Sequence, residues 1–312
     1  MPLFPVNTSQ CHHSYLFQAM GSSCAVQLYA HSAWQAEDAA VLGAEEVLRI
    51  ERKYSRYLSG NTISDINAAA SSGGSIAVDA ETASLLDFAF TCFKSSNGLF
   101  DITSGVLRRA WDFKSMRVPE QDEIDGLLPM VGMHKLVWKR PSLAFTVPGM
   151  EIDFGGIVKE YAADCVVQWL RKDGKPHGIV ELGGDIAAAG PHPDGTPWVI
   201  GVADPSNAAR SIRSVSLLQG GIATSGSYRN AIILGGKRYG HLLNPHTGWP
   251  VTSLLSVTAL GANCMAAGAA ATIAMLKDDH GTAWLDASQM ACLCIDSAGN
   301  YHDTLPRPVE RD

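Results

Sequence analysis

The 312-residue sequence has no uninterrupted run of eighteen apolar residues, so it predicts no membrane-spanning helix. It also lacks a block of Lys and Arg, and its net charge is −7, whereas nucleic-acid-binding proteins normally carry a basic stripe. Its seven cysteines are scattered and include no C-x-x-C pair, which indicates reduced thiols rather than a disulfide framework or a zinc site. There is no Walker loop and no G-x-G-x-x-G after a predicted strand, so the common nucleotide-binding folds are unsupported.

The first 18 residues lack both a basic start and an apolar core, so they do not resemble a signal peptide. Cys11 is not preceded by an apolar segment, which makes it a poor lipid-anchor site. We therefore expect residues 1–18 to form an irregular tail and the protein to be cytoplasmic.

Hydrophobic periodicity places helices and strands along the rest of the chain without regular alternation, and this favours an α+β fold over a doubly wound parallel sheet. The helical pattern covers residues 32–53, 80–96, 119–128, 263–277 and 281–288. Strands are predicted at residues 24–30, 135–139, 143–147, 178–182, 197–202, 212–218, 231–234, 254–260 and 290–296, with a turn at 223–227.

The most informative stretch is residues 152–164, where Asp153 ends an apolar run, Gly155 and Gly156 follow, and an amphipathic segment begins. A strand, a glycine turn and a helix start bring bare backbone N–H groups close to a ligand, and the helix N-terminus favours anions. The same pattern also suits a tight turn without a ligand, because a glycine pair is a weak motif. A second element of this type occurs at Gly183-Gly184-Asp185.

Four further positions each allow a structural and a functional interpretation. Tyr57 stacks on an aromatic ligand or, more commonly, caps the edge of a core. Asp101 lies on a pocket rim or forms a turn, and His241 by itself is best interpreted as a strand-end histidine bonded to backbone. Gly268, in the interior of an Ala-rich helix, costs about 1 kcal/mol relative to Ala, so it indicates close backbone packing or a ligand.

Several of these turns, taken together and in order, resemble the FAD:protein FMN transferases, also called ApbE-type flavin transferases. The resemblance covers nearly the whole chain, and the ordered set is far more specific than any single motif. The matching segments are Met20-Gly21-Ser22, Ser55-Arg56-Tyr57 with Asn67, Gly98 to Thr103, residues 152–164, Leu182 to Asp185, Ala223 to Arg229, His241 to Pro250, Ser256-Val257-Thr258 and the helix that contains Thr272.

The resemblance implies a single domain over residues 19–312, with two closely joined lobes, antiparallel or mixed sheets flanked by helices, and FAD in the cleft between the lobes. It implies an enzyme that cleaves FAD to AMP and attaches FMN through a phosphoester to a Thr or Ser of a partner protein. It implies that His241 assists the attacking hydroxyl, and that Gly156 (backbone oxygen) and Thr272 (hydroxyl) bind Mg²⁺. The FAD contacts that it implies are Met20, Tyr57, Leu99, Phe100, Asp101, Asp153, Lys159 and Leu243.

The chain departs from the family at the metal site, because Gly268 and Ala271 stand where the family has acids, and Glu160 stands where it usually has Gly. A hydroxyl and a carbonyl alone make a weak Mg²⁺ site, since this ion usually takes one or two carboxylates plus substrate phosphate. Three hypotheses remain open: a transferase that recruits its metal through another acid such as Asp185 or through FAD itself, a protein that binds FAD or FMN without transfer, and a protein of this fold with a different ligand.

Overall fold

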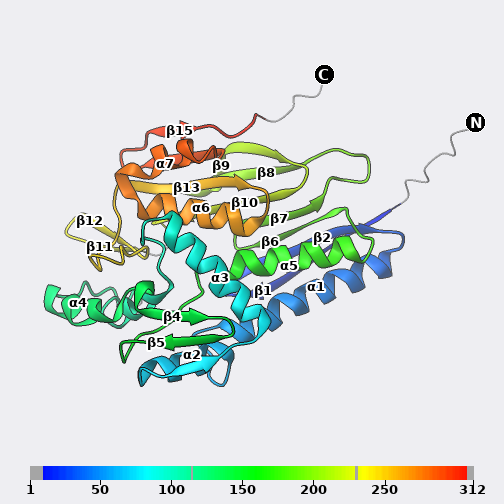
Figure 1. Cartoon of the computed structure of the whole chain (residues 1–312). Helices are drawn as coiled ribbons and strands as arrows, with labels where there is room; N and C mark the ends of the chain where they lie inside the picture. The colour runs from blue at the N-terminus through cyan, green and yellow to red at the C-terminus, as the bar shows by residue number, and fades with distance from the viewer. Residues whose placement is uncertain (1–9, 114, 229–230, 308–312) are drawn as a thin grey trace, which may run out of the picture.

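The computed structural model describes residues 10–113, 115–228 and 231–307. Arg229 of the motifs above and residues 1–9 of the expected tail lie outside these ranges. An eight-stranded sheet, antiparallel throughout, is the centre of the structure (Figure 1). From edge to edge its strands are β1 (Cys11–Ala19), β2 (Ser22–Ala30), β6 (Gly178–Leu182), β7 (Asp185–Gly190), β10 (Gly220–Gly226), β13 (Leu254–Gly261), β14 (Cys292–Asp296) and β15 (Tyr301–Asp303).

Three helices pack on the strands of this sheet: α1 (Ala33–Tyr54) on β1 and β2, α5 (Val158–Lys172) on β6 and β7, and α6 (Cys264–Leu276) on β10 and β13. The α1 and α5 helices approach closely at Gly43, where a Cβ would lie 2.9 Å from Cγ1 of Val166. Short α7 (Gly281–Ala287) packs on α6. Within the described ranges, no helix combines the length and apolar character needed to cross a membrane.

A hairpin of β8 (Trp198–Asp204) and β9 (Asn207–Leu217) contributes to a second apolar cluster with residues of the large sheet. Trp198, Val215 and Leu217 of the hairpin pack there with Ile186 and Ile222. The large sheet therefore contributes side chains to three apolar clusters: one shared with α1, α5 and α6, one with this hairpin, and one between β13, β14, α6 and α7.

The remaining elements lie beside the large sheet and its helices (Figure 1). One buried cluster contains Val26 and Val166 together with Leu85 and Leu143, so a single core joins both groups of elements. These elements are α2 (Thr62–Ser71), α3 (Ala80–Ser95), α4 (Gln121–Leu127), the sheet β3 (Ser75–Ala77), β5 (Ser142–Phe145) and β4 (Leu136–Lys139), the hairpin β11 (Ala231–Leu234) and β12 (Lys237–Gly240), and the 3-10 helices η1 (Ile102–Arg109), η2 (Leu128–Met130), η3 (Met133–Lys135) and η4 (Asp278–His280).

The α+β class is confirmed, but the expectation of an irregular tail through residue 18 is wrong. Residues 11–19 form β1, an edge strand that pairs only with β2 in the sheet order. Its odd-numbered residues are half-buried and its even-numbered residues are exposed, and Tyr15 and Phe17 pack against the core. Polar His13 and Ser14 obscured this alternation, because an edge strand needs only one moderately apolar face.

The turn expected at residues 223–227 is also wrong, because Gly220–Gly226 form β10 in the middle of the sheet. Its small residues allow α6 to approach: a Cβ at Gly221 would lie 2.3 Å from the backbone nitrogen of Cys264. The small residues of β10, which resemble a turn in composition, are therefore needed for the close packing of α6 on the sheet.

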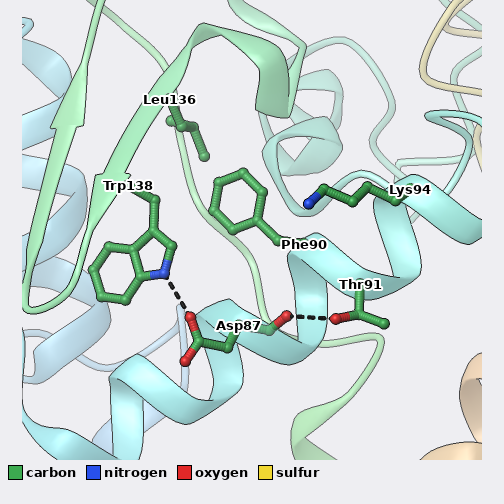
Figure 2. Close-up of a pocket in the computed structure, with 6 residues that line it drawn as sticks. All are labelled: Asp87, Phe90, Thr91, Lys94, Leu136 and Trp138. Carbon is green, nitrogen blue, oxygen red and sulfur yellow. Dashed lines mark hydrogen bonds between the residues drawn. The ribbon is translucent and has the colours of Figure 1, made fainter.

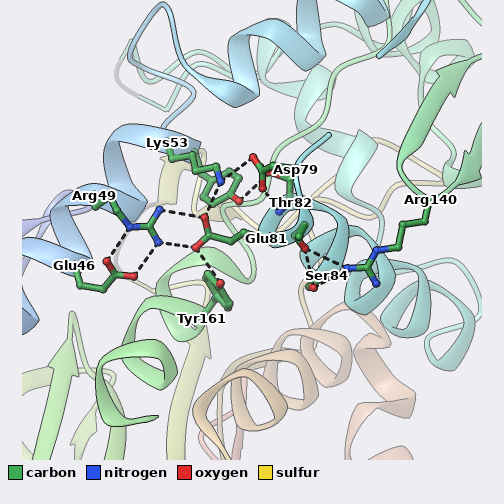
Figure 3. A network of polar contacts seen from close by, with 11 residues as sticks. Glu46, Arg49, Lys53, Asp79, Glu81, Thr82, Ser84, Arg140 and Tyr161 are labelled. Atoms are coloured by element: carbon green, nitrogen blue, oxygen red, sulfur yellow. Dashed lines mark hydrogen bonds and ion pairs between the residues drawn. The ribbon is translucent and has the colours of Figure 1, made fainter. Parts of the chain in front are cut away.

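A polar network around Glu81 ties three helices together (Figure 3). Its carboxylate accepts hydrogen bonds from Arg49 and Lys53 of α1 and, at 3.0 Å, from the Tyr161 hydroxyl in the first turns of α5. Burial alone raises the pKa of Glu81, but these three donors outweigh it and lower the pKa to about 2. The network thereby fixes the start of α5 relative to α1 and α3.

We expect Glu81→Gln to lower the free energy of unfolding by about 1 kcal/mol at pH 7, a value discounted because solvent partly screens the network. Because the pKa of Glu81 is depressed in the folded state, its contribution is present above about pH 4.5 and is lost as the pH falls toward 2. Urea titrations of wild type, Glu81→Gln and the exposed control Glu45→Gln between pH 7 and 3.5 measure the difference. A difference for Glu81→Gln that does not shrink below pH 4.5 would contradict this explanation.

Candidate functional site

The glycine turn before α5 is held by charged side chains of neighbouring elements. Asp153 Oδ2 lies 2.9 Å from Nη1 of Arg56 and 3.7 Å from Nε of Arg108, while its Oδ1 accepts a 2.8 Å hydrogen bond from the Gly155 N–H. The carboxylate of Asp153 therefore sets the shape of the turn and has two cationic partners. Its backbone N–H also donates to the carbonyl of Ile102, which joins the turn to η1.

Gly156 lies at the open side of this turn and is exposed. A Cβ at Gly156 would lie 3.5 Å from Cζ of Phe100, so the buried Phe100 ring lies beside the turn. The α5 helix starts two residues later, and its first N–H groups have no partners within the helix. The turn thus combines an exposed glycine, an aromatic ring and a helix N-terminus suited to an anion.

The α5 and α6 helices pack together in a defined register. Asp164 of α5 accepts hydrogen bonds from the backbone N–H groups of Cys264 and Met265, both at 2.9 Å, and so caps α6. Glu160, four residues before Asp164 on α5, lies against Gly268, four residues after Cys264 on α6. The helices are therefore antiparallel here, and Thr272 lies one further turn along α6, in the direction of the start of α5. Thr272 Oγ1 lies 2.6 Å from Oγ of Ser225 in β10.

Glu160 occupies the space that a side chain at position 268 would need. A Cβ built on Gly268 would lie 2.6 Å from Cγ and 2.7 Å from Oε1 of Glu160. The Glu160 side chain is buried, and its Oε2 has no hydrogen-bond partner among the described residues. Burial, reinforced by the nearby charge of Asp185, raises the pKa of Glu160 to about 8.

Lys159 joins the first turn of α5 to the second glycine turn. Its Nζ lies 2.5 Å from Oδ2 of Asp185, whose Oδ1 accepts a 3.0 Å hydrogen bond from the Thr224 N–H. Burial alone lowers the pKa of Lys159, but Asp185 and then Glu160 outweigh it, so the pKa is raised and the ammonium form is favoured. Gly183 and Gly184 both have positive φ and form the tight turn between β6 and β7 that places Asp185.

Asp101 has a structural network of its own. Its Oδ1 accepts from the N–H and the hydroxyl of Thr103 at 2.8 and 2.5 Å, and its Oδ2 accepts from the Met133 N–H at 2.9 Å. The Thr103 hydroxyl in turn accepts from the Gly132 N–H. Burial raises the pKa of Asp101, partly offset by these donors. Both carboxylate oxygens of Asp101 are therefore bonded within the chain. The side chain that lies beside the glycine turn is that of the neighbouring Phe100.

The other residues implied by the resemblance are more dispersed. Met20 forms the β1–β2 turn with positive φ and donates its N–H to Glu51 of α1. Tyr57 is 79% exposed, and Leu99 packs against the core next to Phe100. His241 follows β12 and is half-buried. Leu243 packs in a separate apolar cluster with Trp111.

A cavity of about 440 Å³ lies elsewhere, between α3 and β4 (Figure 2). Trp138 Nε1 donates a 2.6 Å hydrogen bond to Asp87 at one side of it. None of the residues implied by the resemblance lines this cavity; its lining residues are Asp87, Phe90, Thr91, Lys94, Leu136 and Trp138.

The fold and these contacts define an α+β protein in which two glycine turns, a half-buried lysine and a helix N-terminus meet, an arrangement suited to a phosphorylated ligand. Residues 20–294 match the model of the ApbE family, and the chain belongs to this family.

Relatives and solved structures agree with this assignment. A Vibrio cholerae protein named FAD:protein FMN transferase is 31% identical over 255 residues, which are 79% of this chain and 75% of that protein. An Escherichia coli K12 protein of the same name is 31% identical over 184 residues, 56% of this chain and about half (52%) of its own length. The crystal structure of an ApbE protein from Thermotoga maritima superposes with a TM-score of 0.86 at 29% identity, covering 94% of this chain and 97% of the other.

Sequence reasoning noted Glu160 only as a departure and did not assign it a role. The sequence did contain a signal that Glu160 is buried. Together with Asp164, Val167 and Leu170 it follows helical spacing, and these residues lie on the buried face of α5. Two acids on an otherwise apolar face need partners, and those of Asp164 are the first N–H groups of α6.

Proposed function

We propose that this protein is an FAD:protein FMN transferase, which cleaves FAD to AMP and attaches FMN to a Thr or Ser hydroxyl of a partner protein. Family membership supports this proposal. The observation that carries it is the Lys159 ammonium held by Asp185 at the N-terminus of α5, beside both glycine turns. A positive group at a helix N-terminus suits the linked phosphates of FAD.

In the proposed reaction the acceptor hydroxyl oxygen forms a bond to the FMN-side phosphorus of FAD. The bond from that phosphorus to the bridging oxygen breaks, and AMP leaves with the electron pair. The hydroxyl proton passes to a base, for which we propose His241, since an imidazole accepts a proton near neutral pH. Lys159, at the N-terminus of α5, stabilises the negative charge on the phosphate oxygens.

The residues proposed to contact FAD have different parts in this scheme. Phe100 lies beside the glycine turn, and exposed Tyr57 offers a ring for stacking. Asp153, with its two arginine partners, and Asp101, with its internal hydrogen bonds, act by holding the local backbone in place. The full proposed set is Met20, Tyr57, Leu99, Phe100, Asp101, Asp153, Lys159 and Leu243.

The family also implies Mg²⁺, for which we propose the backbone oxygen of Gly156 and the hydroxyl of Thr272 as ligands. Among the described residues no group of three or more His, Cys, Asp and Glu side chains is arranged to bind a metal. The buried oxygen of Glu160, together with those two proposed ligands, nevertheless gives the all-oxygen donor set, with few carboxylates, that Mg²⁺ accepts when phosphate completes its shell. When bound, this ion neutralises charge on the phosphates.

We expect His241→Ala to lower the rate of AMP release from FAD by about 100-fold, because the attacking hydroxyl (that of water when no acceptor protein is added) loses its base, while the Kd for FAD changes only a few-fold. Stopped assays of AMP, together with flavin-fluorescence titrations, separate the two effects. A rate equal to that of wild type would exclude His241 as the base.

Covalent transfer itself is tested by mixing the purified chain, FAD and Mg²⁺ with a protein extract and viewing the denaturing gel under ultraviolet light. The proposal expects a fluorescent band that requires the chain, FAD and Mg²⁺ together. FAD binding with neither a band nor AMP would instead identify a flavin-binding protein without transferase activity, the alternative favoured by the absence of acids at Gly268 and Ala271.

A further inference from the structure

We propose that Glu160, in the first turn of α5, is a carboxylate ligand of a divalent cation bound between α5 and α6. The inference depends on the proposed function for the role of that cation, but the site itself is argued from this chain's own residues.

The first observation is the environment of the Glu160 carboxylate, of which Oε2 is buried without a partner among the described residues. Three other acids in this part of the fold are equally buried but are satisfied. Asp101 accepts from Thr103 and Met133, Asp164 from the N-terminus of α6, and Asp185 from Lys159 and Thr224. An unpaired buried carboxylate is costly, so its retention at Glu160 indicates a partner that binds there.

The second observation is that position 268 makes room for Glu160. The side chain fits because residue 268 is glycine: any Cβ there would lie within 2.9 Å of three Glu160 atoms. An interior helix glycine costs about 1 kcal/mol relative to Ala. The chain therefore accepts a weaker α6 in order to place a carboxylate from α5 against it.

The third step is an inference from the register of α5 and α6, by which we place two further oxygen ligands near this carboxylate. The Glu160 carboxyl group lies against Gly268, Thr272 is one turn further along α6, and Gly156 precedes the start of α5. The Gly156 carbonyl, the Thr272 hydroxyl and the Glu160 carboxylate are all hard oxygen ligands. The ion pair of Lys159 is with Asp185, at 2.5 Å.

The test is a titration of the purified protein with Mn²⁺ alone, in which electron paramagnetic resonance follows the free ion. Glu160→Gln keeps the shape of the side chain and removes its charge, and the exposed Glu45→Gln is the matched control. A double variant, Glu160→Gly with Gly268→Asp, returns the carboxylate to α6 and removes the steric conflict. Thermal unfolding of each variant establishes that it is folded.

We expect one Mn²⁺ per wild-type chain, a Kd raised at least tenfold in Glu160→Gln, an unchanged Kd in Glu45→Gln, and binding within a few-fold of wild type in the double variant. Three results would each overturn the proposal: unchanged Mn²⁺ binding in Glu160→Gln, no Mn²⁺ binding to the wild type, or no Mn²⁺ binding to the double variant. Glu160 would then be a neutral space-filling residue.

The two proposals fail in distinguishable ways. If the wild type releases AMP from FAD with Mg²⁺ while Glu160→Gln binds Mn²⁺ normally, the transferase proposal stands and the Glu160 ligand falls. If Mn²⁺ binds through Glu160 but FAD yields no AMP, the metal site stands and the transferase proposal falls.

Discussion

Gly268→Asp alone is expected to lower the free energy of unfolding by at least about 3 kcal/mol, because overpacking a core and burying a second carboxylate both carry a cost. The new Cβ would lie 2.6 Å from Cγ of Glu160, on a helix whose N-terminus is fixed by Asp164 and whose sheet-facing side packs on β10 and β13. Neither helix can shift without breaking those contacts. Urea denaturation of wild type and variant measures the loss.

The cause is tested by a double-mutant cycle. Combining Gly268→Asp with Glu160→Gly should recover most of the loss, with a coupling energy of about 2 to 3 kcal/mol. Gly126→Asp is the matched control, since Gly126 is also inside a helix and a Cβ there meets nothing within 4 Å, so its effect should stay within about 0.5 kcal/mol. Additive effects of the two substitutions would show that Glu160 and Gly268 do not compete for one space.

Asp101→Ala is expected to lower the free energy of unfolding by about 3 to 5 kcal/mol. The buried carboxylate accepts three hydrogen bonds, two from Thr103 and one from the Met133 N–H, and alanine leaves those donors unsatisfied. These bonds connect η1, next to the glycine turn, to the segment before β4. Urea denaturation at pH 7 measures this loss as well.

Two companion variants separate this network from a general effect of losing an acid. Asp101→Asn keeps one acceptor oxygen and should cost less than Asp101→Ala. Asp38→Ala removes an exposed acid of α1 and should change stability by less than about 0.5 kcal/mol. Equal losses for Asp101→Ala and Asp38→Ala would show that the buried hydrogen bonds contribute nothing specific.

Much of the fold followed from periodicity. The helix expected at residues 32–53 is α1, and the strand expected at residues 24–30 is part of β2, because both have a continuous apolar face. The strands β1 and β10 could not be predicted from periodicity, for two different reasons. β1 is a partly polar edge strand, and β10 consists of small residues that allow α6 to approach. In both cases tertiary packing decides the structure where local composition does not.

The site was predictable in outline only. The two glycine turns were visible in the sequence, but a glycine pair alone is a weak motif, and Lys159 was singled out only through the resemblance to the family. The pairing of Lys159 with Asp185, and of Glu160 with Gly268, joins residues more than 20 positions apart and depends on the register of α5 against β7 and α6. That register is a property of packing and cannot be read from either segment alone.

The most direct test of the account is the amount of AMP released when the purified wild-type chain is incubated with FAD and Mg²⁺, compared with an identical sample containing EDTA. In this mixture water takes the place of the acceptor hydroxyl, so FMN forms together with AMP. The account predicts AMP in the Mg²⁺ sample and its absence with EDTA, since the phosphoryl chemistry requires the cation that Gly156, Thr272 and Glu160 are proposed to bind. FAD bound by the chain but recovered intact with Mg²⁺ would contradict it.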